Sequence, residues 1–221
     1  MEFPGAGWSH EKNPKFELPT TPEEENALIL ERSKYLLEHI AETEKERKRE
    51  REEHGIDHLT KTYTRAAFEA KLAHAFEPHR RKGEKRAVEA SLIFIDLDKF
   101  KEVNDTLGHL AGDQTLKRAA TLLHGALRED DVLGRYGGDE FVVLLLDENQ
   151  ENARRVAENL RSALDDDPEL KKLGITGSFG VCSSSMLGAD VSPEKLVEKA
   201  DHALYVAKDG GRNRVEVYQG A

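Results

Sequence analysis

The chain has 221 residues, which is enough for one domain with a substantial core plus an additional segment. Its formal net charge of −10 and its isoelectric point of about 5.5 argue against a protein that adheres broadly to nucleic acid or anionic lipid. The single cysteine, Cys182, excludes an internal disulfide bond and fits a reducing cytosol best. Because the sequence shows neither a secretory signal nor an apolar run of ~18–20 residues, we expect a cytoplasmic protein without a membrane span.

The first 22 residues contain four prolines, a density that breaks both helix and strand. We therefore expect residues 1–22 to form an extended arm. Arms of this kind are more often disordered than ordered. Three scattered aromatic residues, Phe3, Trp8 and Phe16, give the arm a means of docking on a protein partner or on the protein's own surface.

A long helix is predicted over residues 23–55, because residues 23–54 contain no glycine or proline and good helix formers dominate. An apolar stripe of about two heptads follows one side of this helix. The stripe consists of Leu28 or Ile29, Ser33, Leu36, Leu37 and Ile40. After Ala41 every side is charged, and Gly55 suits the end of a helix. We interpret the helix as a coiled-coil stalk that pairs two chains; the alternative is a helix packed on its own domain.

Residues 56–221 have the pattern of a compact domain in which helices and strands alternate. Apolar periodicity predicts helices at 68–76, 116–126, 156–163 and 193–207, and strands at 91–97, 141–146, 175–181 and 214–218. Ser192 followed by Pro193 marks the start of the last helix. A hairpin described below requires antiparallel pairing, so we expect an α/β (α+β) fold with a mixed, largely antiparallel central sheet flanked by helices.

Acidic residues stand at the ends of two predicted buried strands. The first strand runs directly into Asp96, and the second begins after the run Gly137-Gly138-Asp139-Glu140. Two glycines between apolar strands predict a tight hairpin in which both adopt positive φ angles. If the strands are neighbours, Asp96 and Asp139 converge at one end of the sheet. Converging carboxylates suit Mg²⁺ that also holds substrate phosphates. The alternative is that these residues form only a polar turn.

The run from Gly137 to Phe141 is accompanied by four further blocks in a fixed order. They are Asp57-His58-Leu59-Thr60 with Tyr63, Arg65 and Phe68; Phe94 to Lys101 with Asn104-Asp105, Gly108-His109 and Gly112-Asp113; Ser178-Phe179-Gly180-Val181; and Ala200-Asp201 to Arg214. Over residues 56–218 these blocks resemble the GGDEF family, the diguanylate cyclases. The opening block departs from the family pattern D-x-L-T-G-L-x-N-R, with Lys61, Thr62 and Thr64 in place of Gly, Leu and Asn.

The resemblance implies a fold like that of nucleotidyl cyclases and polymerase palm domains, with the helical stalk in front of it. It also implies a metal site formed by Asp96, Asp139 and the main-chain carbonyl of Leu97 for Mg²⁺, with Mn²⁺ as a substitute. Glu140 would help to hold the metal and act as base toward a 3′-hydroxyl, which a bound metal makes easier to deprotonate.

The remaining substrate positions also follow from the resemblance. Asn104 and Asp113 would read guanine, because an Asp accepts hydrogen bonds from groups that adenine lacks. His109 would be a further substrate contact, with a structural loop histidine as the alternative. Lys101, Lys208 and Arg212 would bind phosphates, and Gly137 and Gly138 would leave room for the nucleotide.

Arg128 and Asp131 form an R-x-x-D pattern just before the hairpin, where the family has its product-inhibition site. Arginine can pair bidentately with a phosphate or a guanine edge of the dimeric product. The alternative is a surface turn with an ion pair.

The implied reaction condenses two molecules of GTP into cyclic di-GMP with release of two pyrophosphates. One domain binds one GTP, so two domains must face each other in a homodimer, which the N-terminal helix would assemble. Two alternatives from other classes are a catalytically inactive receptor for cyclic di-GMP and a GTP-binding scaffold whose arm recruits a partner.

Overall fold

The computed structural model describes residues 33–37, 39–40, 55–77, 89–188 and 191–220. The predicted arm over 1–22 and most of the predicted helix over 23–55 lie outside these residues. The chain divides into two units, residues 1–48 and 49–221. In the first unit, residues 33–37 and 39–40 are helical, and the side chains of Leu36, Leu37 and Ile40 are exposed. Within the part of the chain that is described, no helix is long and apolar enough to cross a membrane.

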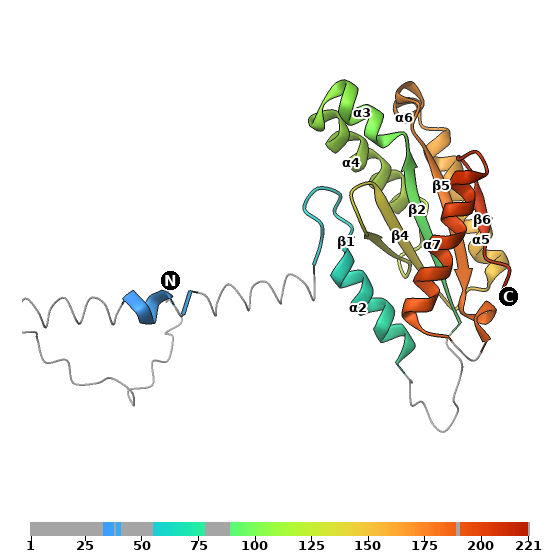
Figure 1. The fold of residues 1–221 in the computed structure, drawn as a ribbon, viewed down its shortest axis with the longest axis horizontal. Coiled ribbons are helices and arrows are strands. Elements are labelled where there is room, and N and C mark those ends of the chain that lie inside the picture. The colour runs from blue at the N-terminus through green and yellow to red at the C-terminus, as the bar shows by residue number, and fades with distance from the viewer. Residues whose placement is uncertain (1–32, 38, 41–54, 78–88, 189–190, 221) are drawn as a thin grey trace, which may run out of the picture. The chain divides into compact units, whose positions relative to one another are not determined.

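The second unit contains a six-stranded sheet with the order β1-β3-β4-β2-β5-β6 (Figure 1). The strands are β1 (Tyr63–Thr64), β2 (Ala90–Asp98), β3 (Val132–Arg135), β4 (Glu140–Leu146), β5 (Thr176–Ser183) and β6 (Val215–Val217). The central pairs β3–β4, β4–β2 and β2–β5 are antiparallel, and the outer pairs β1–β3 and β5–β6 are parallel. The predicted mixed, largely antiparallel sheet is therefore confirmed.

Helices cover both faces of this sheet. They are α2 (Arg65–Phe76), α3 (Phe100–Leu107), α4 (His109–Gly125), α5 (Gln150–Asp165), α6 (Pro168–Leu173) and α7 (Pro193–Asp209), with a short 3-10 turn, η2 (Ser184–Met186). In Figure 1, α7 crosses in front of β2 and β5. As the sequence predicts, Ser192 caps α7, accepting a hydrogen bond from the Lys195 N–H at 3.2 Å.

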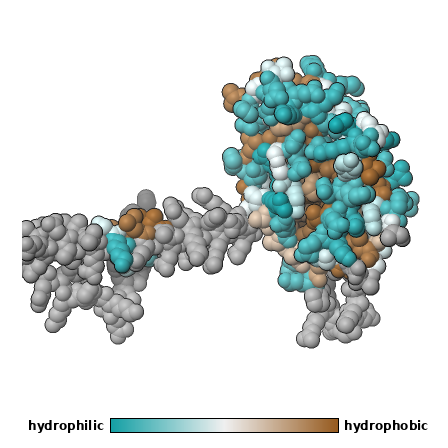
Figure 2. Space-filling model, in the orientation of Figure 1, coloured by the Kyte–Doolittle hydropathy of each residue, from teal (hydrophilic) through white to brown (hydrophobic). Residues whose placement is uncertain are grey.

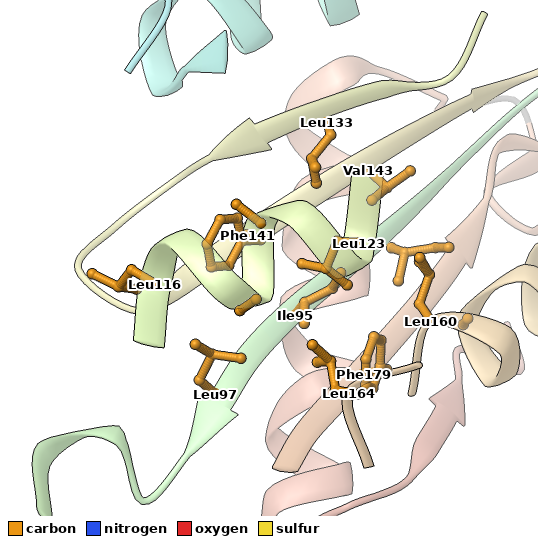
Figure 3. Close-up of a cluster of buried hydrophobic side chains, with 14 of the residues drawn as sticks. Ile95, Leu97, Leu116, Leu123, Leu133, Phe141, Val143, Leu160, Leu164 and Phe179 are labelled. Carbon is orange, nitrogen blue, oxygen red and sulfur yellow. The ribbon is translucent and has the colours of Figure 1, made fainter. Parts of the chain in front are cut away.

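The central strand β2 is buried on both faces, so it contributes to two apolar clusters. Ile93, Ile95 and Leu97 pack with β4, α4 and α5, and Figure 3 shows Ile95 and Leu97 pointing into this cluster with Phe141 and Leu160. Alternate residues such as Phe94 pack on the other side with α2 and α7. On the surface, Figure 2 shows hydrophilic side chains over much of one face, with smaller hydrophobic areas between them.

Two helices and two short strands are absent from the sequence prediction. Helix α3 begins after Lys99, whose φ is 62° and whose side chain makes no capping hydrogen bond, so no cap signal precedes it. Helix α6 has only six residues, and β1 and β3 have two and four. Elements this short offer too few residues for a periodic pattern to appear.

The predicted geometry of the hairpin is wrong. Positive φ angles occur at Gly108, Gly174, Gly188, Gly211 and Gly220 among the described glycines, but not at Gly137 or Gly138. Residues 136–139 form a longer connection between β3 and β4, closed by a hydrogen bond from the Tyr136 N–H to the Glu140 carbonyl at 2.9 Å. A loop of this length does not need the two-residue turn that demands positive φ. Gly137 lies close to Glu140, and a Cβ there would meet the end of the Glu140 side chain, which would have to turn aside.

Helix α7 approaches β5 most closely at Gly180. A Cβ at this position would overlap the carbonyl oxygen of Ala200 and the main-chain nitrogen of Leu204. Both are helix backbone atoms that cannot rotate away, so a side chain at Gly180 would push α7 off the sheet.

We expect Gly180→Ala to lower the free energy of unfolding by at least about 2 kcal/mol, because overpacking against backbone forces the helix to shift. Denaturant unfolding of the purified chain measures this. Gly125→Ala at the end of α4 is the matched control: its Cβ would meet nothing within 4 Å, and its φ is not positive. Equal stability of the two variants would contradict the close approach.

Candidate active site

The acids predicted to converge lie at neighbouring strand ends, with Asp96 in β2 and Asp139 in the loop one residue before β4. Asp96 of β2 lies directly opposite Glu140 of β4, so the two side chains share one face of the sheet. The Leu97 N–H donates a hydrogen bond to the Asp139 carbonyl at 3.3 Å, which holds the next acid beside the end of β2. The prediction that the two strands are neighbours is confirmed.

A lysine from α7 neutralises part of this acidic cluster. Lys208 Nζ lies 2.7 Å from Oδ2 of Asp96, and the Asp96 side chain is only 14% exposed. Burial raises the pKa of Asp96 to about 6, with the nearby charges of Asp139 and Glu140 acting in the same direction and Lys208 opposing them. The carboxyl of Asp96 therefore needs a cation beside it to stay ionised.

The oxygen donors suit a hard divalent cation. Among the described residues, no three His, Cys, Asp or Glu side chains already form a metal-binding group, and the Asp96 carboxylate is paired with Lys208. Asp96, Asp139 and Glu140 nevertheless offer carboxylate oxygens at the ends of adjacent strands, which is the donor set that Mg²⁺ prefers. These residues fit the implied metal, while the ligand role of the Leu97 carbonyl stays a prediction.

A second acid of β2, Asp98, has a different partner set. Its side chain is 2% exposed and accepts hydrogen bonds from the hydroxyls of Thr176 and Ser178, each at 2.7 Å. It also accepts one from the Asn213 N–H at 3.1 Å. The carboxylate thus joins the end of β2 to β5 and to the turn after α7. The sequence predicts no role for Asp98, although its spacing of two from Asp96 indicates that both lie on one face of the strand.

The turn after α7 carries Arg212, a predicted phosphate ligand. Arg212 and Asn213 have φ angles of 64° and 46°, which is uncommon for residues other than glycine. The Asn213 side chain is held by Arg161 and Asp165, each at 3.1 Å, and its N–H by Asp98. Such backbone persists only where its surroundings over-determine it, so the exposed Arg212 is presented by a fixed turn.

Arg135 holds the glycine-rich loop in place, a role that the sequence did not predict. Its guanidinium donates two hydrogen bonds to the Gly138 carbonyl, at 3.1 and 2.7 Å, and contacts the Asp57 carboxylate at 3.3 Å. Burial alone would raise the pKa of Asp57, but hydrogen bonds from Thr60 and the charge of Arg135 outweigh it, so the pKa is lowered. Asp57 of the opening block therefore holds Arg135, which in turn holds the loop at Gly138.

The three departures in the opening block are compatible with its local structure. Lys61 has a φ of 62°, which explains a preference for glycine at this position. Thr62 is buried and its hydroxyl lies 2.9 Å from that of Thr60. Thr64 caps α2, accepting a hydrogen bond from the Ala67 N–H at 3.4 Å, a role that Asn also fills.

The residues predicted to read guanine lie on the helical hairpin that follows β2. Asn104 belongs to α3, and His109 and Asp113 begin α4 after the turn at Gly108. Asn104 packs against Gly112, where a Cβ would overlap its amide oxygen. His109, Asp113 and Lys101 are exposed. Within the described part of the chain, no hydrogen bond or ion pair links these four residues to the acids, so their substrate roles stay predictions.

The R-x-x-D residues lie apart from the acids, on the turn between α4 and β3. Asp131 accepts a hydrogen bond from the Arg128 N–H at 2.9 Å, whereas the Arg128 guanidinium pairs with Glu148 at 2.6 Å. Burial raises the pKa of Asp131. A pocket of about 710 Å³ adjoins this turn and is lined by Lys61, Tyr63, Lys71, His124, Arg128 and Asp131 among others. Its lining includes none of the acids at the end of β2.

Comparison with known proteins places this geometry in a family. A model described as "Diguanylate cyclase, GGDEF domain" matches residues 54–214. Diguanylate cyclase DosC of Escherichia coli is 36% identical over 178 residues, which cover 76% of this chain and 36% of DosC. The chain therefore spans about a third of the length of that relative.

Two solved structures extend the comparison. The coiled coil and GGDEF domain of DgcB from Caulobacter crescentus, in complex with c-di-GMP, has a TM-score of 0.66 and 29% identity. The match covers 84% of this chain and 98% of the DgcB chain in that structure. Diguanylate cyclase SiaD from Pseudomonas aeruginosa, in complex with its activator SiaC, has a TM-score of 0.65 and 28% identity. The match covers 88% of this chain and 78% of the SiaD chain. On the family match and the relative's identity, this chain belongs to the GGDEF family of diguanylate cyclases.

Proposed function

We propose that this chain is a diguanylate cyclase that condenses two GTP into cyclic di-GMP. The observation that carries the proposal is the register of β2 and β4, which sets Asp96 opposite Glu140 while the Leu97 N–H holds the Asp139 carbonyl. An inactive member of the family would not need these acids, and the motif from Gly137 to Phe141 is intact.

The proposed substrate site combines three parts of the domain. The α3–α4 hairpin supplies Asn104 and Asp113 for the guanine edge, with His109 as a further contact. The loop at Gly137 and Gly138 leaves its backbone open to the nucleotide, since a Cβ at Gly138 would meet nothing within 4 Å. Lys101, Lys208 and Arg212 supply cations for the triphosphate.

The proposed chemistry is a phosphoryl transfer carried out twice. Glu140 takes the proton from the 3′-hydroxyl of one GTP, the 3′-oxygen forms a bond to the α-phosphorus of the other, and the bond between the α- and β-phosphates breaks to release pyrophosphate. A divalent cation held by Asp96, Asp139 and Glu140 would lower the pKa of the attacking hydroxyl and offset charge on the phosphates.

Two domains must meet for this reaction, so we propose a homodimer assembled by the helix over 23–55. The exposed Leu36, Leu37 and Ile40 in its described part support the proposal. The DgcB structure, which contains a coiled coil with the GGDEF domain, gives a precedent. The SiaD–SiaC complex is a precedent for a protein partner of a diguanylate cyclase, and we propose the arm over 1–22 as the segment that binds such a partner here.

Asp139→Ala and Glu140→Ala should each reduce formation of cyclic di-GMP from GTP and Mg²⁺ by at least about a hundredfold, because each removes several kcal/mol of transition-state stabilisation. Chromatography of the reaction products measures this. Asp166→Ala, which removes an exposed acid at the end of α5, is the control and should retain activity. A folded, dimeric native protein that makes no product would instead favour the receptor or scaffold function.

Arg128→Ala should raise the concentration of cyclic di-GMP needed for half-inhibition by about tenfold or more, because charge-assisted hydrogen bonds to the product are lost. Initial rates of pyrophosphate release at increasing cyclic di-GMP give this value. Lys172→Ala on α6 removes a cation from a different element and should leave inhibition as in the native protein. Unchanged inhibition of the Arg128 variant would refute the inhibitory site.

Leu37→Glu combined with Ile40→Glu should convert a dimer into a monomer and lower turnover per chain about tenfold or more at micromolar concentration, since tethering supplies the effective concentration. Light scattering after size-exclusion chromatography reports the mass. Tyr35→Glu changes an exposed residue of the same helix outside the apolar stripe and serves as control. A monomeric native protein with full activity would rule out the stalk.

A further inference from the structure

Lys208 occupies a position beside Asp96 that a metal cation bound to the acids would also need. Its Nζ lies 2.7 Å from Oδ2 of Asp96, within the same acidic cluster as Asp139 and Glu140. A buried carboxylate without a counter-ion is costly, so this ion pair stabilises the metal-free domain. A divalent cation on Asp96 would bring two cationic centres to the same carboxylate, and their repulsion would displace the more mobile one.

The position of Lys208 allows such a displacement. It lies in the last turn of α7, which ends at Asp209, and its side chain is 33% exposed, so its flexible stem has solvent to swing into. The same turn leads to Arg212, which the proposed function assigns to the triphosphate. A rotation of the lysine stem would carry Nζ from the Asp96 carboxylate into solvent, where a bound phosphate would be its new partner.

We propose that Lys208 is an internal counter-ion that holds Asp96 in the metal-free protein and passes to a nucleotide phosphate when a divalent cation takes its place. This inference rests on the proposed function, whose substrate it concerns. It makes the domain resist the bare metal and accept metal and nucleotide together. By linkage, a phosphate that attracts Lys208 away from Asp96 strengthens metal binding, and the reverse holds equally.

The exchange predicts that one substitution of Lys208 changes two binding affinities in opposite directions. Lys208→Gln should bind Mn²⁺ alone more tightly than the native chain, by about three- to tenfold, because the competing charge is gone. It should bind the α,β-methylene analogue of GTP with Mg²⁺ more weakly, because a phosphate partner is lost. A lysine with a merely structural role would weaken both. Electron paramagnetic resonance of free Mn²⁺ and calorimetry with the analogue measure the two affinities without turnover.

Four further variants make the test specific. Lys208→Arg keeps the charge and should keep the low affinity for Mn²⁺ alone, and Lys208→Met repeats the charge removal if the Gln variant does not fold. Lys199→Gln removes a lysine of the same helix that pairs with Glu198 and should leave Mn²⁺ affinity unchanged. Adding Asp96→Asn to Lys208→Gln should abolish the gain.

Equal or weaker Mn²⁺ binding by folded Lys208→Gln or Lys208→Met overturns the proposal, and so does unchanged affinity for the analogue. Because neither readout requires cyclic di-GMP to form, failure of the exchange is distinguished from failure of the cyclase activity. A chain that makes no product but shows both opposite shifts would retain the exchange and lose the proposed reaction.

Discussion

The site depends on one constraint, the burial of β2 between β4 and β5 on its edges and between helices on both faces. A strand held on all sides has no freedom to slip, because a shift of one residue would turn its apolar side chains to the wrong face. Its register therefore fixes where Asp96 and Asp98 stand relative to Glu140, Ser178 and Thr176. The positions of the acidic side chains are therefore set by the apolar packing of the strand that carries them.

Two acids two residues apart on this strand have different kinds of partner. Asp98 accepts hydrogen bonds from two hydroxyls and a main-chain N–H, and Arg212 lies 3.9 Å away. Asp96 is paired with Lys208, whose long side chain is flexible. Hydrogen bonds from backbone and hydroxyls make a permanent structural joint, whereas a lysine makes an exchangeable one. The end of β2 thus carries one acid held mainly by hydrogen bonds and one held by a lysine.

The sequence predicts the fold class, the four longer helices and the main strands, because long apolar patterns carry that information. It also locates the acids, since a carboxylate after a buried strand is conspicuous. It does not reveal the brace from Asp57 through Arg135 to Gly138, which joins residues far apart in the chain. The predicted loop geometry was wrong because a Gly-Gly pair is typical of a two-residue turn, whereas residues 136–139 connect β3 and β4 here.

The hydrogen bond from Asn213 to Asp98 spans 115 positions of the chain. During synthesis from the N-terminus, β2 and the α3–α4 hairpin emerge long before the residues that complete their surroundings. Asp98 cannot gain its last partner, nor Asp96 its lysine, until α7 and the following turn have left the ribosome. A nascent chain that has reached β5 therefore holds most of the sheet while Asp96 still lacks its lysine and Asp98 its hydrogen bond from Asn213.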